Sequence, residues 1–187
     1  MIDTYLNLDG IPGEALDDKH QGWIEVLSYG HEMNQPVSGT KSSAGGAPTG
    51  RSEHKDIIIT KYVDKASTKL YAAVSSGKPV AKAKLEFCRA GGSQVKFLEI
   101  NLEEVVISHV SAASNAGGTT GSPGTTGTPG STGTTGSTGT SGQDLPVEEV
   151  HLNYAKIEWI YTQQKRKDGS GGGNVTAKHD LTTGKTE

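Results

Sequence analysis

Apolar and polar residues alternate over several long stretches of this chain, a pattern typical of β-strands. Six stretches show it: residues 2–8, 23–33, 54–61, 80–89, 94–110 and 147–163. The last two are unusually long and match each other in length, so we expect them to pair. In the first of these two the alternation slips in phase at 103–106, which predicts a bulge or a bend. A polar stretch at 174–182 has the pattern of a last edge strand.

Residues 64–77 form the one segment with a convincing helical pattern. Asp64 or Ser67 can cap the first turn, Gly77 can take the left-handed C-cap conformation, and Pro79 prevents continuation. Because a helix of about three turns is marginal alone, we expect it to pack on β-sheet. Its apolar residues recur at i, i+3, i+4 and i+7 and form one stripe: Leu70, Ala73, Val74 and Gly77. Long paired strands with one helix indicate a mainly β fold, an antiparallel barrel or sandwich.

A Gly/Thr-rich tract separates the two longest predicted strands. From Gly118 to Gly142 every third residue is glycine, as in collagen, but only Pro123 and Pro129 supply the proline that collagen needs. Both ends of the tract are tied to strands that we expect to be neighbours. These features favour a flexible or loosely extended hairpin loop over bundling with neighbouring copies.

The 187 residues fit a single domain spanning 1–187. Within it we expect 115–142 to be a flexible Gly-X-Y loop insertion and 168–187 to be a C-terminal turn with an edge strand.

The net charge of −3 provides no basic surface for nucleic acid, and no apolar run is long enough to insert into a membrane. The first ten residues lack the basic and apolar regions of a signal peptide, so we expect synthesis in the cytoplasm without a cleaved signal.

A search for catalytic motifs predicts no enzyme, no cofactor and no metal site. Residues 184–186 (GKT) match the last three residues of a phosphate-binding loop. The glycine that this motif requires five residues earlier is replaced by His179. Cys88 lies alone in a predicted strand and reads as a buried side chain. The densest polar cluster, around His20, reads as a solvated turn that ties down a loop rather than as a metal site. Trp159 and Tyr161 read as core or interface residues rather than as a carbohydrate platform.

Several short motifs occur in an order that is specific to one family, although no single motif would be. They are 9–14 (DGIPGE), 17–20 (DDKH), 24–28 (IEVLS), 60–67 (TKYVDKAS), 77–78 (GK), 89–92 (RAGG), 97–100 (FLEI) and 152–157 (LNYAKI). In these motifs the chain resembles the haemolysin-coregulated protein (Hcp) family of type VI secretion. The resemblance covers about residues 2–110 and 145–175.

The resemblance implies a two-sheet antiparallel β-barrel with the helix covering one side. It implies a homo-hexameric ring, stacked rings that form the inner tube, and secretion into the extracellular space or a target cell. The implied partners are a tip spike protein, a contractile sheath and small effectors carried in the lumen. Family members are not enzymes and need no cofactor. The Gly/Thr-rich tract departs from family members of ordinary length.

The residues alone leave two other classes open. A soluble β-sandwich module that binds carbohydrate or protein is the alternative, and a hydrolase is a distant third. The mass in solution separates a ring from a binding module, because a ring contains several copies of the chain.

A long polar loop at 34–52 has almost no periodicity. Ordering a structureless loop of this length costs conformational entropy unless contacts compensate. Gln35, Pro36 and Val37 are its one semi-rigid, partly apolar segment. We therefore expect these three residues to contact the next subunit or the next ring.

Overall fold

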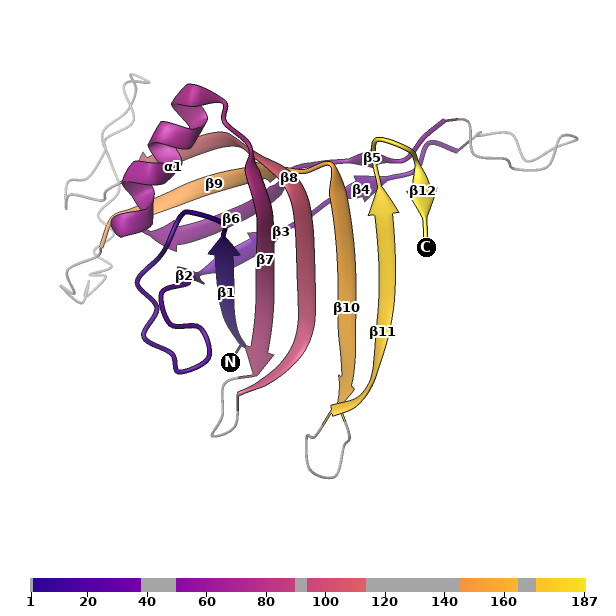
Figure 1. Ribbon diagram of the computed structural model, residues 1–187, viewed down its shortest axis with the longest axis horizontal. Coiled ribbons are helices and arrows are strands. Elements are labelled where there is room, and N and C mark those ends of the chain that lie inside the picture. The colour runs from indigo at the N-terminus through magenta and orange to yellow at the C-terminus, as the bar shows by residue number, and fades with distance from the viewer. Residues whose placement is uncertain (1, 38–49, 90–93, 114–144, 165–170) are drawn as a thin grey trace, which may run out of the picture.

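The computed structural model describes residues 2–37, 50–89, 94–113, 145–164 and 171–187 (Figure 1). The predicted loop insertion at 115–142 lies outside these residues. The described residues form one helix and twelve strands: β1 (Ile2–Leu8), β2 (Ile24–Val26), β3 (Ser28–Gly30), β4 (Met33–Asn34), β5 (Glu53–His54), β6 (Ile57–Tyr62), α1 (Lys65–Ser76), β7 (Val80–Arg89), β8 (Val95–Ala113), β9 (Val147–Asn153), β10 (Lys156–Gln164), β11 (Gly171–Asp180) and β12 (Lys185–Thr186).

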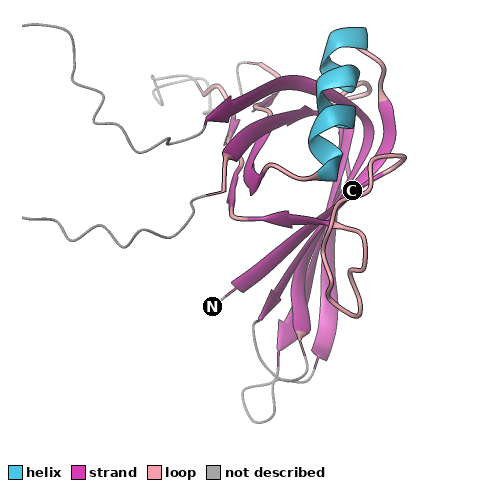
Figure 2. Cartoon of the chain, turned by 90° about the vertical axis from the view of Figure 1, so that its left-hand side faces the viewer, coloured by secondary structure: helices cyan, strands magenta, loops and turns pink. Residues whose placement is uncertain are grey.

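Ten of the strands form two antiparallel sheets that share β8, and β4 pairs with β5 in a separate two-stranded sheet. The large sheet has the order β12-β11-β10-β8-β7-β1-β2, and the small sheet has the order β8-β9-β6-β3. Leu27 joins β2 of the large sheet to β3 of the small sheet, and its amide donates to the carbonyl of Thr60 on β6. This arrangement confirms the predicted mainly β, antiparallel two-sheet architecture with one helix on its side (Figure 2).

The bend predicted in the long strand lies at Glu104. This residue has φ 54°, in the left-handed region that non-glycine residues rarely adopt. On one side of it β8 pairs with β10 as far as Glu103, and on the other side β8 pairs with β9 from Val106 onward. The register with β7 is unchanged across this point. The phase slip is therefore a bend that carries one strand from the large sheet into the small one.

Three predicted strands are interrupted in the structure. The stretch predicted at 23–33 divides into β2, β3 and β4 because the chain changes sheets at Leu27. The stretch at 147–163 divides into β9 and β10 around Tyr154, whose ring is buried beneath two histidines. The stretch at 54–61 divides into β5 and β6. The polar C-terminal strand is β11, which starts at Gly171, pairs along β10 and is joined at its end by β12.

The helix α1 has the caps that its sequence predicts. The carboxylate of Asp64 accepts from the amide of Ala66 at 2.9 Å, and the hydroxyl of Ser67 accepts from the amide of Asp64 at 3.0 Å. Gly77 has φ 63° and ends the helix. Leu70 is fully buried, whereas Ala73 and Val74 are half-buried. The buried face is thus centred nearer the N-terminal turn than the predicted stripe, because Ala66 and Ser67 also face the sheet.

One continuous apolar core fills the space between the two sheets and α1. Its fully buried side chains come from both sheets and from the helix: Leu6, Ile24, Ile57, Ile59, Leu70, Leu85, Val105, Val150 and Leu152. No described helix is long and apolar enough to cross a membrane.

Leu70→Ala should destabilise the fold, because a fully buried leucine is replaced by a cavity between α1 and the sheets. Such changes cost about 2–5 kcal/mol of unfolding free energy. Lys69→Ala, on the exposed side of the same turn, is the matched control and should change stability little. Denaturant unfolding of both variants measures the difference. Small and equal effects would show that this face of α1 does not carry the packing.

Candidate functional site

A fully buried ion pair joins α1 to the small sheet. Lys61 on β6 and Glu148 on β9 are 1% and 0% exposed, and the Lys61 Nζ lies 2.7 Å from the Glu148 Oε1. The same Nζ lies 2.7 Å from the Asp64 Oδ1, the N-cap carboxylate of α1. The Ser67 hydroxyl donates to the Glu148 Oε1 at 2.6 Å, and the Tyr71 hydroxyl donates to the Oε2 at 2.9 Å.

Every oxygen of the buried Glu148 carboxylate therefore has a partner. The hydrogen bond to Glu148 raises the pKa of the Tyr71 phenol, and burial and the nearby negative charge add to this effect. A buried charge is tolerated when its hydrogen bonds are complete, and removal of one partner leaves the other uncompensated. These hydrogen bonds and ion pairs hold β6, β9 and the first turn of α1 together, so the role of the buried pair is structural.

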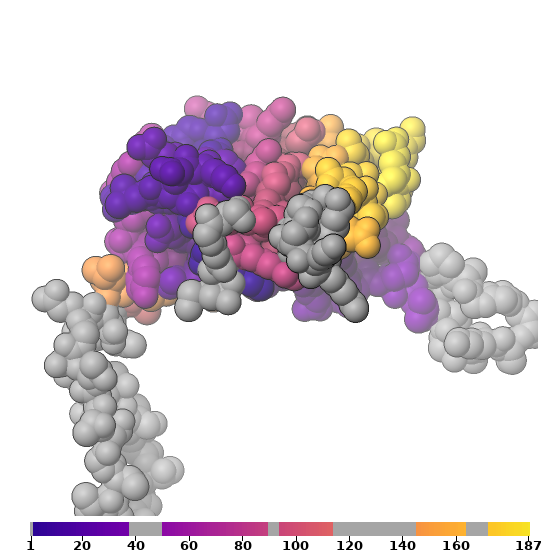
Figure 3. Space-filling model, turned by 90° about the horizontal axis from the view of Figure 1, so that it is seen from below, coloured from indigo at the N-terminus to yellow at the C-terminus, as the bar shows by residue number. Residues whose placement is uncertain are grey.

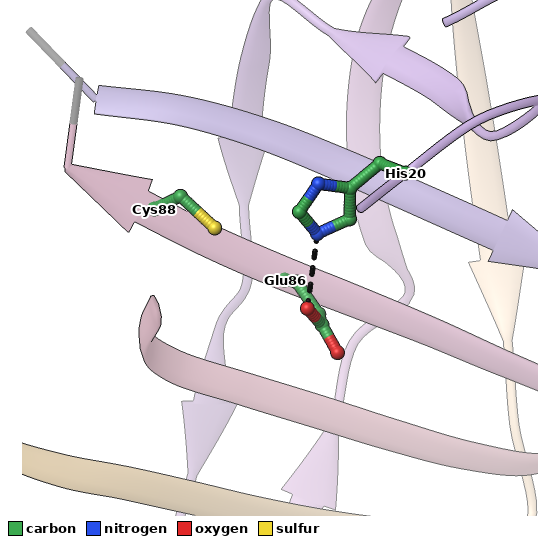
Figure 4. A group of neighbouring side chains, drawn as sticks. All are labelled: His20, Glu86 and Cys88. Atoms are coloured by element: carbon green, nitrogen blue, oxygen red, sulfur yellow. Dashed lines mark hydrogen bonds and ion pairs between the residues drawn. The ribbon is translucent and has the colours of Figure 1, made fainter. Parts of the chain in front are cut away.

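The loop between β1 and β2 is held to the large sheet by His20, which is 2% exposed. Its Nδ1 lies 2.5 Å from the Asp17 Oδ1 and its Nε2 lies 3.0 Å from the Glu86 Oε2 (Figure 4). Its ring stacks on Tyr5 of β1 at 4.2 Å. Burial opposes ionisation of Asp17, but hydrogen bonds from His20 and Lys19 outweigh it and lower the Asp17 pKa. These contacts agree with the predicted role of tying down a loop. Asp18 and Lys19 of the turn are exposed, as predicted, but the His20 ring is buried.

Cys88 lies near this group without forming a reactive site. Its sulfur is within 4.8 Å of ligand atoms of His20 and Glu86, a spacing that could suit a metal ion (Figure 4). Both nitrogens of His20 are already engaged by carboxylates, however. Burial raises the pKa of the Cys88 thiol, so it stays protonated and is a poor nucleophile. The structure thus agrees with the prediction of a buried, unreactive cysteine.

The predicted contact segment lies on a projecting hairpin arm. We define the arm as β4, β5 and the described residues next to them, 35–37 and 50–52; it extends away from the two sheets (Figure 1). Gln35 is exposed and donates from Nε2 to the carbonyl of Gly50 at 2.8 Å. Pro36 is half-buried and Val37 is 71% exposed. The loop predicted at 34–52 is therefore anchored by a two-stranded base, and its residues 38–49 lie outside the described part of the chain.

A group of aromatic and histidine rings packs around Tyr154 at the base of the arm. The Tyr154 hydroxyl lies 2.6 Å from the His31 Nε2 and 3.0 Å from the His54 Nδ1. His179 of β11 stacks on His54 with ring centroids 4.8 Å apart. Trp159 is half-buried and its ring lies beside His31, with ring centroids 6.4 Å apart. We call these five residues the histidine–tyrosine cluster.

Burial sets the ionisation of this cluster. It lowers the pKa of His31 and of His54, and the neighbouring histidines lower them further. Burial also raises the pKa of the Tyr154 phenol. The neutral imidazoles are therefore the favoured form, and they hold the base of the arm against β10 and β11.

Exposed apolar side chains gather on two sides of the molecule. Leu16, Tyr62, Val63 and Leu145 line one hollow and are between 39% and 89% exposed; we call this the Leu16 hollow. Tyr161 on β10 and Val175 on β11 pair across the strands, 48% and 66% exposed. We call this pair the β10–β11 face. The β1–β2 loop and the start of β9 lie at the end of the molecule opposite the C-terminal strands (Figure 3).

Comparison with known proteins shows to which family this chain belongs. The family described as "Type VI secretion system effector, Hcp" matches residues 5–161. The chain belongs to the Hcp family. Protein hcp1 of Pseudomonas aeruginosa is 34% identical over 175 residues, which are 93% of this chain and 91% of the relative. The "Major exported protein" of the same organism is 28% identical over 151 residues, 80% of this chain and 74% of the relative.

Solved structures agree with this assignment. One described as "Structure of a type six secretion system protein" matches with a TM-score of 0.81 at 26% identity, and the match covers 100% of both chains. Hcp1 from Salmonella typhimurium matches with a TM-score of 0.68 at 25% identity over 100% of this chain and 99% of that one. The resemblance drawn from the motifs is confirmed, and this Hcp chain is a component of the type VI secretion tube. Nothing in the comparisons supports the alternative of a carbohydrate- or protein-binding module.

Glu148→Ala should destabilise the Hcp fold by about 3–5 kcal/mol, because it leaves Lys61 as a buried charge without its main partner. The neighbouring Glu149→Ala is the matched control, since its side chain is 45% exposed and points to the opposite face. Denaturant unfolding of the two variants gives the comparison. Equal stabilities would contradict the role assigned to the pair.

Stability should fall as the pH drops through about 6.5, the ordinary pKa of histidine. The folded protein holds the pKa of His31 and His54 below this value, so the unfolded chain binds more protons there. The loss should level off below the folded-state pKa values. Unfolding midpoints between about pH 8 and about 5.5 measure it, above the range in which carboxylates protonate.

The control for this pH dependence is the double variant His31→Gln/His54→Asn. Glutamine places a nitrogen near the former Nε2 and asparagine one near the former Nδ1, so both contacts to Tyr154 can be kept without a titratable group. The slope of stability against pH should be shallower in this variant. An unchanged slope would mean that other groups cause the dependence.

Proposed function

We propose that this Hcp chain forms homo-hexameric rings that stack into the inner tube of a type VI secretion system. In this proposal the tube carries small effectors in its lumen, meets a tip spike protein at its end and is driven by a contractile sheath. The chain leaves the cell with the tube and acts without catalysis. The single observation that carries the proposal is family membership across residues 5–161.

The two apolar surfaces supply the contact that a ring needs. A cyclic ring is built from heterologous contacts, in which one surface of a subunit meets a different surface of its neighbour. The Leu16 hollow and the β10–β11 face lie at opposite ends of the molecule. Burial of these exposed apolar side chains against a neighbouring subunit would be favourable. We therefore assign the contact within the ring to these two surfaces.

The arm is assigned to contact between rings. The Gln35 side chain donates to the Gly50 carbonyl and so links the two sides of the arm next to Pro36 and Val37. The exposed Val37 side chain gains from burial against a partner. The arm also extends away from the sheets that carry both ring-contact surfaces (Figure 1). These features support Gln35, Pro36 and Val37 as the stacking segment.

Electron microscopy of two variants tests both assignments in one experiment. Val175→Asp puts a charge on the β10–β11 face and should give folded monomers. Insertion of an Asp-Lys pair between Pro36 and Val37 should leave rings intact but reduce their stacking and their secretion. Thr68→Asp, on the exposed side of α1, is the control and should behave like the unaltered chain. Circular dichroism establishes that each variant is folded.

Two results would contradict the assignments. Normal rings from Val175→Asp would exclude the β10–β11 face as a ring contact. Normal tubes and normal secretion from the insertion variant would exclude the arm as a stacking element.

A further inference from the structure

Three potential metal ligands meet on neighbouring strands of the small sheet, and none of them belongs to the groups of side chains described above. His109 lies on β8, four residues before that strand ends at Ala113, and is exposed. Glu149 and His151 lie on β9, close to its start at Val147, and are half-exposed. One ligand atom from each of the three residues lies within 4.8 Å of the others.

The register of the two strands creates this meeting. His109 is directly opposite His151, and the two ring centroids are 4.8 Å apart. Glu149 is two residues from His151 and so shares its face, and its Oε1 lies 2.8 Å from the His151 Nε2. Two imidazoles and a carboxylate therefore converge from two neighbouring strands.

A local irregularity puts His109 in this position. The pairing of β8 with β9 shifts by one residue between Ile107 and His109. With the register that holds up to Ile107, Ser108 would stand opposite His151. The shift leaves Ser108 to bond to Asp56 and brings His109 across from His151. Bulges that redirect one side chain are frequent beside functional sites.

The nitrogens here are also more available than those of the other histidine groups. Both nitrogens of His20 bond to carboxylates, and His31 and His54 bond to Tyr154. Within the described part of the chain, no hydrogen bond engages either ring nitrogen of His109. His151 bonds only through Nε2, to the carboxylate that would be its co-ligand.

We propose that His109, Glu149 and His151 bind a divalent transition metal ion such as Zn²⁺. Two neutral imidazoles and one carboxylate are a ligand set that Zn²⁺ takes in proteins, with a fourth position left for water. The ion links β8 to β9 near the ends of both strands and fixes their register. Its binding weakens as the pH falls, because protonated histidine cannot ligate.

Calorimetric titration of Zn²⁺ into the full chain, prepared without a histidine tag, tests the proposal. The unaltered chain should bind one Zn²⁺ per chain, more weakly at about pH 5.5 than at about pH 7.5. His109→Ala and His151→Ala should each weaken binding at least about tenfold. His179→Ala is the control: it removes a histidine of the separate histidine–tyrosine cluster and should leave the affinity unchanged.

Visible absorption of Co²⁺ in the same variants gives a second readout, because the d–d bands report coordination by the protein. These bands should be present in the unaltered chain and in His179→Ala, and should be lost in His109→Ala. The ligands are exposed or half-exposed, so the variants should fold, which circular dichroism checks. No Zn²⁺ binding by the unaltered chain would overturn the proposal. An affinity in the His109→Ala and His151→Ala variants that equals that of the unaltered chain would overturn it too, as would loss of binding in His179→Ala alone.

Discussion

The buried pair of Lys61 and Glu148 is the constraint on which the rest of this structure depends. It brings together β6, β9 and the first turn of α1, and all of its polar atoms described above have partners. A buried ion pair contributes little net stability relative to apolar packing, but it strongly disfavours any arrangement that separates its partners. It therefore fixes where the helix sits on the small sheet. With the helix in place, the bend at Glu104 and the change of sheets at Leu27 enclose one core.

The regular part of this fold follows from local sequence. The caps of α1, the limits of β7 and the pairing of the long strand with the segment after the Gly/Thr-rich tract were all predictable from period and turn chemistry. The interruption at Tyr154 was not, because it depends on histidines that approach from positions 31 and 54. The two-stranded base of the arm was not predictable from the sequence. Its strands β4 and β5 have two residues each, which are too few to show alternation.

The functional groups were less predictable than the fold, for a physical reason. Sequence spacing shows only ligands that are close along the chain, and no two histidines lie close together in this sequence. His109 and His151 meet only through strand pairing and a one-residue register shift, neither of which leaves a mark in local composition. Lys61 and Glu148 look like ordinary surface residues until the strands place both of them inside. The family motifs supplied what periodicity lacked, since they identify the Hcp family, on which the proposed role of the exposed apolar surfaces rests.

The mass of the purified chain in native mass spectrometry tests the central claim, that this is a ring-forming subunit, most directly. The account predicts one dominant species of about six times the 19.5 kDa chain, because a closed ring satisfies both apolar surfaces of every subunit. A dominant species at 19.5 kDa at concentrations where the protein is folded would contradict it. A symmetric dimer would contradict it equally, because it would bury one surface against its own copy and leave the other exposed.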